Sequence, residues 1–128
     1  MRMLLIALAL AAPAHADISD KVSVAGCDFS DMSRSWILCD ITNHTEHSIA
    51  SVSVQHIYTE PGRTIPWVDT RDSDLPYGTG DIAGGIEPGE TINHIVRTPG
   101  LSSRADPKAV EFAITPIKAV TANGDVLE

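Results

Sequence analysis

Apolar and polar side chains alternate along five stretches of the chain, which is the two-residue period of a β-strand. β-Branched residues are frequent in these stretches, and they suit the pleated surface of a sheet. After the N-terminal leader, no segment keeps a helical period for more than one or two turns. The alternation therefore predicts strands over residues 21–27, 35–42, 49–59, 90–98 and 108–115.

Each predicted strand gathers apolar residues on one face, because successive side chains point to opposite sides. The second strand also carries Trp36 and Leu38 on its other face, so both of its faces are expected to be partly covered. A strand tryptophan of this kind is expected in or near the core. The sets that share a face are Ile37, Cys39 and Ile41; Val52, Val54, His56 and Tyr58; Ile92, His94 and Val96; and Val110, Phe112 and Ile114.

Residues 60–89 break the alternation. This segment is dense in proline, glycine and aspartate, and it predicts a long loop with a short edge strand near residues 65–68. Loops of this length are uncommon in a small domain and are often functional.

The stretch "IAGGIEPGETINHIV", residues 82–96, raises the question of a phosphate-binding loop because three of its residues are glycines. Such a loop follows a strand, opens a helix and usually contains Gly-Lys-Ser/Thr. Here the lysine is missing, and a period of two follows the glycines instead of a helix. Pro88 and Gly89 suit the second and third positions of a type II turn. The stretch is therefore interpreted as a turn that starts a strand.

About seven short strands at regular spacing predict an all-β fold, a single immunoglobulin-like β-sandwich. Asn123-Gly124 adds a hairpin signal near the C-terminus. The sandwich is expected to span residues 17–128, a length that suits one domain with one core.

Residues 1–16 have the pattern of a secretory signal peptide: a positive residue, an apolar run over residues 4–12, and small residues at Ala14-His15-Ala16. The apolar run is too short to span a bilayer, and no second long run follows. Cleavage after Ala16 starts the mature chain at Asp17, whereas cleavage after Ala14 starts it at His15, and both stay open. We expect a periplasmic or secreted protein with no membrane span in the mature chain.

The chain is acidic, with 17 Asp and Glu residues against 9 Lys and Arg residues and a net charge of −8. This balance argues against nucleic acid and anionic membranes as partners, and it favours a basic partner or a cation.

Cys27 and Cys39 are the two cysteines of the chain. In an exported protein such a pair predicts a disulfide, here one that joins two neighbouring strands. A redox pair is more typically Cys-x-x-Cys on a helix, so the role is interpreted as structural.

The segments "CDITNHTEHSIASVSVQHIYTEPGRTI" and "IEPGETINHIV" together resemble a family of small bacterial extracytoplasmic sandwich domains, often called FxLYD-like. The resemblance covers about residues 35–98. It implies an accessory or interaction domain and no catalytic activity. The residues that carry it are Ile41, Asn43, Ile49, Val52, Val54, Tyr58, Gly62, Pro88, Gly89 and Glu90.

The sequence offers no recognisable nucleophile: it has no Gly-x-Ser-x-Gly and no Ser-x-x-Lys. We therefore expect a protein that is not an enzyme and has no cofactor.

Four aspartates lie in the long loop, but the glycine and the distal glutamate of an EF-hand loop are absent, and Arg71 competes for the carboxylates. An ion-paired, solvated loop is the favoured interpretation of Asp69, Asp72, Asp74 and Asp81.

Trp67 and Tyr77 flank the acidic part of the loop, and exposed aromatic residues there could anchor a partner. Equally, the two rings could pin the loop onto the sheet. The predicted binding residues are Trp67, Tyr77, Asp72 and Asp74, and the predicted function is a protein-binding or envelope accessory module with an unidentified partner. The sequence does not decide the oligomeric state.

The alternative function is a periplasmic copper carrier that uses histidines. Neutral histidine is the commonest metal ligand, and an N-terminal His15 could offer its amine and its ring to one copper ion. The ligands would come from His15, His47, His56 and His94. Against this stands the lack of a tight histidine spacing, so the favoured interpretation is that the histidines are solvated turn residues and sandwich-margin residues.

Overall fold

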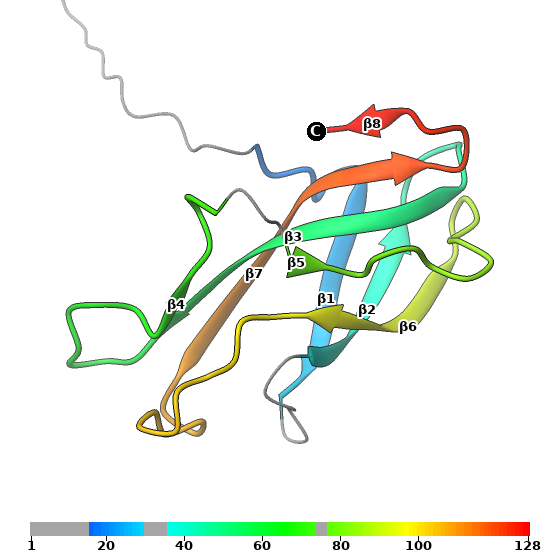
Figure 1. Ribbon diagram of the computed structural model, residues 1–128. Helices are drawn as coiled ribbons and strands as arrows, with labels where there is room; N and C mark the ends of the chain where they lie inside the picture. The colour runs from blue at the N-terminus through cyan, green and yellow to red at the C-terminus, as the bar shows by residue number, and fades with distance from the viewer. Residues whose placement is uncertain (1–15, 30–35, 74–76) are drawn as a thin grey trace, which may run out of the picture.

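The computed structural model describes residues 16–29, 36–73 and 77–128, which leaves most of the predicted signal peptide, His15 and Asp74 outside the description. The described residues contain no helix and form eight strands (Figure 1). They are β1 (Val22–Asp28), β2 (Trp36–Asn43), β3 (Ile49–Thr59), β4 (Val68–Asp69), β5 (Tyr77–Gly78), β6 (Thr91–Arg97), β7 (Glu111–Thr121) and β8 (Val126–Leu127).

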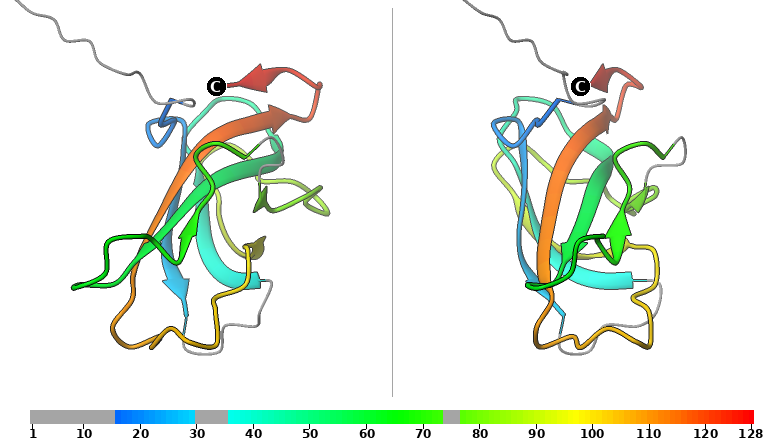
Figure 2. Two further views of the ribbon diagram at one scale, coloured as in Figure 1. Left: turned by 60° about the vertical axis from the view of Figure 1, so that its left-hand side comes forward. Right: turned by 90° about the vertical axis from the view of Figure 1, so that its left-hand side faces the viewer.

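The strands form two antiparallel sheets that pack face to face (Figure 2). One sheet has the order β1-β2-β6, and the other has the order β4-β3-β7-β8 with β5 also paired to β3. The predicted all-β sandwich is confirmed.

Within the part of the chain that is described, no helix is long and apolar enough to cross a membrane.

The core lies between the sheets and contains the faces that the alternation predicted. Ile37, Cys39 and Ile41 of β2 are fully buried and meet side chains of β3 from the other sheet. A second, smaller cluster closes one end of the sandwich, where Tyr58 meets the loop between β6 and β7. The buried members of this end cluster are Tyr58, Val68, Ala105 and Val110.

Cys27 and Cys39 form the predicted disulfide, with their Cα atoms 4.0 Å apart. Ala25 pairs with Asp40 and Asp28 with Leu38, so β1 has one extra residue at this point. This β-bulge, at a glycine with a positive φ of 58°, places Cys27 across from Cys39. A disulfide that closes a loop of this size stabilises a fold by roughly 3 kcal/mol in the chain-entropy model.

The described residues of the segment 60–89 contain more regular pairing than a single long loop would have. β4 and β5 both pair with the same edge of β3, and Ile86 forms a bridge to Ile49 farther along that edge. The expected edge strand near 65–68 is shifted, because Ile65 is 77% exposed and pairing starts only at Val68. The segment thus covers the edge of β3, which would otherwise present unpaired backbone groups.

The type II turn predicted at residues 87–90 is present: Gly89 has a φ of 79°, and the Glu90 N–H donates to the Glu87 carbonyl at 3.0 Å. The predicted hairpin at Asn123-Gly124 joins β7 to β8. No phosphate-binding loop opens here, because the strand β6 follows the turn.

Gly78→Ala is expected to destabilise the protein by about 2 kcal/mol, the typical cost of overpacking. A Cβ on Gly78 would lie 2.1 Å from the Val52 carbonyl oxygen, so β5 would have to leave β3. Urea unfolding measures the loss, with the exposed Asp81→Ala in the same segment as the control. An unchanged midpoint for Gly78→Ala would show that β5 is not packed as described.

Candidate functional site

Trp67 lies at the end of the sandwich where two loops meet. These are the β3–β4 loop, residues 60–67, and the β6–β7 loop, residues 98–110, and both lie away from the C-terminus (Figures 1 and 2). The indole is half-buried and packs on the end cluster that includes Val110. The ring is therefore held by both loops while part of it stays in solvent.

Hydrogen bonds fix the orientation of the ring. The Trp67 indole N–H donates to Oε1 of Glu60 at 3.0 Å, and its backbone N–H donates to the Tyr58 carbonyl at 2.8 Å. The sequence left open whether Trp67 pins the loop or anchors a partner. The structure shows that it pins the loop, and its exposed part remains available for contact.

Two arginines lie against the same ring. The Arg63 guanidinium carbon is 4.1 Å from the ring centroid of Trp67, and that of Arg104 is 5.5 Å away. Both arginines are exposed, and so is Ile65, which lies between Arg63 and Trp67 in the sequence of the β3–β4 loop. We call Arg63, Ile65, Trp67 and Arg104 the Trp67 surface.

No sequence pattern indicates the two arginines or Ile65 as binding residues. Arg104 comes from a loop far along the chain, and no spacing signal connects it to Trp67. The β6–β7 loop reaches the ring because Ala105 and Val110 are buried in the end cluster. Arg63 alone could have been noticed, since it lies four residues before Trp67 in the long loop.

The other predicted binding residues do not join this surface. Tyr77 pairs with Val54, four positions along β3 from the Tyr58–Val68 pair, and its half-buried ring lies 6.2 Å from the His56 ring. Asp72 is exposed, and Asp74 falls outside the described residues.

Arg71 forms an ion pair with Asp69, as the ion-paired interpretation of the loop predicted. The pKa of Asp69 is lowered, mainly by the hydrogen bond that its carboxylate accepts from the Arg71 side chain. Because both side chains are partly exposed, the pair is expected to add little to stability.

His56 is fully buried and joins the two sheets. Its Nε2 lies 2.9 Å from the carbonyl oxygen of Arg97 at the end of β6, so Nε2 must carry the proton. Nδ1 then accepts a hydrogen bond from the Tyr58 hydroxyl at 2.8 Å, and Thr98 Oγ1 lies 2.6 Å from that hydroxyl. The prediction of a margin residue was wrong for His56, because its polar atoms are satisfied inside the core.

The pKa of His56 is lowered from its ordinary value of 6.5 to about 4, mainly because the ring is buried. Burial likewise raises the pKa of Tyr58 to about 12. Both groups are therefore neutral at physiological pH. Their hydrogen bonds link β3 to β6 and have a structural role.

Of the histidines proposed as copper ligands, His15 lies outside the described residues, and the structure does not gather the other three into a metal site. His94 lies in β6 and is paired with Cys39, whereas His56 belongs to the other sheet with both ring nitrogens engaged. His47 is exposed in the turn between β2 and β3. Among the described residues, no three His, Cys, Asp or Glu side chains are close enough to hold a metal ion.

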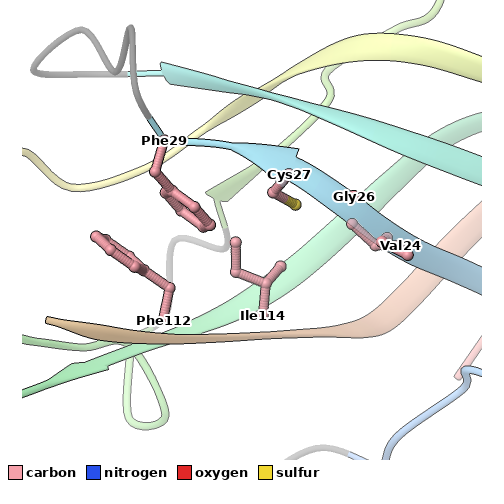
Figure 3. Close-up of a pocket in the computed structure, with 7 residues that line it drawn as sticks. Val24, Gly26, Cys27, Phe29, Phe112 and Ile114 are labelled. Atoms are coloured by element: carbon pink, nitrogen blue, oxygen red, sulfur yellow. The ribbon is translucent and has the colours of Figure 1, made fainter. Parts of the chain in front are cut away.

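A small pocket of about 200 Å³, lined by apolar side chains and by backbone, lies between β1 and β7 (Figure 3). Phe29 and Phe112 stack over it with ring centroids 3.8 Å apart, and Ile114 and Cys27 line it from opposite sides. The volume is smaller than that of ordinary ligand pockets, and none of the lining side chains is ionisable.

No family model, curated protein or solved structure matches the chain. The resemblance to FxLYD-like domains therefore stays a prediction.

Proposed function

We propose that this chain is an exported, non-catalytic protein-binding module that contacts its partner through the Trp67 surface. Tryptophan and arginine are the residue types most enriched among the energetically dominant residues of interfaces. The observation that carries the proposal is the exposed Ile65, 77% accessible, beside a tryptophan held in place by Glu60. A ring that is already fixed loses little conformational entropy on binding.

Export is supported by the leader pattern over residues 1–16 and by the Cys27–Cys39 disulfide. Disulfides persist in oxidising compartments such as the periplasm or the extracellular space. The partner would therefore be another protein of that compartment or of the cell envelope.

Photo-crosslinking in the producing cell tests the binding surface. A benzophenone side chain at position 65 is expected to crosslink one dominant protein, and Trp67→Ala is expected to reduce that product about tenfold, as for a dominant interface residue. The matched control carries the same probe in place of Val126, which is 50% exposed in β8. Equal products from both positions, or none from position 65, would contradict the proposal.

A further inference from the structure

The Trp67 surface contains two arginines that form no direct ion pair within the described part of the chain. The ion pair found among the described residues joins Arg71 to Asp69, and no carboxylate of that part of the chain lies within ion-pair distance of Arg63 or Arg104. Glu60 accepts a hydrogen bond from the indole N–H of Trp67, so one negative charge adjoins the ring that the two arginines contact. With two arginines against one glutamate at the ring, the surface keeps a net positive charge in a chain whose net charge is −8.

Stacking against Trp67 also prepares the Arg63 guanidinium for binding. A guanidinium stacked on an aromatic face keeps the N–H donors at its edge directed outward, and its fork geometry matches a carboxylate. The contact at 4.1 Å restricts the side chain before a ligand arrives. Less conformational entropy is then lost on binding than for a freely moving arginine.

We propose that the Trp67 surface recognises an acidic segment of the partner protein, in which a glutamate or aspartate carboxylate binds Arg63 and Arg104 and an adjacent apolar side chain contacts Ile65. The inference rests on the proposed function, since it names the chemistry of the partner for the same surface. Charge-assisted, bidentate arginine–carboxylate pairs supply specificity and strength. The exposed Ile65 favours a peptide over a free anion, and the acidic chain as a whole disfavours an anionic membrane.

Titrations followed by ¹⁵N NMR of the whole mature protein test the inference. The probes are a synthetic peptide of alternating glutamate and leucine, its matched glutamine–leucine peptide, and inorganic phosphate. We expect the glutamate peptide to shift the indole N–H signal of Trp67 and the side-chain N–H signals of Arg63 and Arg104, with an affinity about tenfold higher than that of the glutamine peptide. This difference should shrink as salt is added.

Two variants connect the shifts to the arginines. Arg63→Gln with Arg104→Gln is expected to abolish the preference for glutamate, while Arg71→Gln, at an exposed arginine outside the surface, should retain it. Equal affinity for the two peptides, or phosphate binding as strong as that of the glutamate peptide, would overturn the inference.

The same double variant separates this inference from the proposed function. If crosslinking from position 65 persists undiminished in Arg63→Gln with Arg104→Gln, the acidic partner is wrong while the binding surface stands. If crosslinking from position 65 is absent in the unmodified background, the proposed function itself fails.

Discussion

Asn43→Ala is expected to lower the free energy of unfolding by about 4 kcal/mol, because it removes four hydrogen bonds of about 1 kcal/mol each from a buried site. Asn43 is fully buried at the end of β2. Its Nδ2 donates to the carbonyl oxygens of His47 at 2.7 Å and Ile86 at 2.9 Å. Its Oδ1 accepts from the backbone N–H of Thr45 at 2.8 Å and from the Thr45 hydroxyl at 2.7 Å.

The position of these partners explains why the effect should be large. The side chain ties the turn after β2 to residue 86, at the far end of the segment that covers β3. The backbone of Asn43 is tied to the same region, since its N–H donates to Glu90 and its carbonyl accepts from Gly89. Asn43 therefore holds the β2–β3 turn and the type II turn together.

Chemical denaturation monitored by circular dichroism measures this loss. The matched control is Asn93→Ala, an exposed asparagine on β6 whose side chain bonds to Asp40, and its cost should stay below about 1 kcal/mol. A change of less than about 1 kcal/mol for Asn43→Ala would show that water or neighbouring groups replace the lost bonds.

The strands were predictable because alternation is a local signal. β3 and β6 lie within two residues of their predicted limits, and the faces of β2 and β3 were assigned correctly. β4 and β5 were not predictable as observed, since strands of two residues leave no pattern and exist only because β3 offers them an edge. The disulfide was predictable from the expected export of the chain and from its two cysteines. The β-bulge that places Cys27 across from Cys39 was not predictable.

The polar interior and the Trp67 surface depend on residues far apart in the chain. Alternation placed His56 on an apolar face, yet nothing in the sequence pairs it with the Arg97 carbonyl or identifies Tyr58 as its donor. Arg104 meets Trp67 only after the β6–β7 loop folds onto the end cluster. Local patterns thus predicted the scaffold, while the contacts between loops required the structure.

Acidification from pH 6.5 to 4 is expected to cost the protein roughly 3 kcal/mol of unfolding free energy through His56. The pKa of His56 is about 4 in the folded protein, whereas the ordinary value of 6.5 applies to the unfolded chain. As the pH falls, the unfolded chain therefore takes up the proton before the folded protein does. The contribution of neutral His56 is therefore complete above pH 6.5 and is lost as the pH falls toward 4. About 2 kcal/mol of it should already be lost at about pH 5, before most carboxylates take up protons.

Unfolding curves between pH 4 and 7 measure this loss, and His56→Gln should flatten them over that window because no proton can then be taken up at this position. His56→Gln also lowers stability at pH 7, since the bonds to Tyr58 and Arg97 are weakened, so the slope is the decisive quantity. His47→Gln, at an exposed position, should leave the slope unchanged. An NMR titration of the folded protein that places the pKa of His56 near 6.5 would contradict the prediction, because the buried imidazole would then gain its proton without penalty.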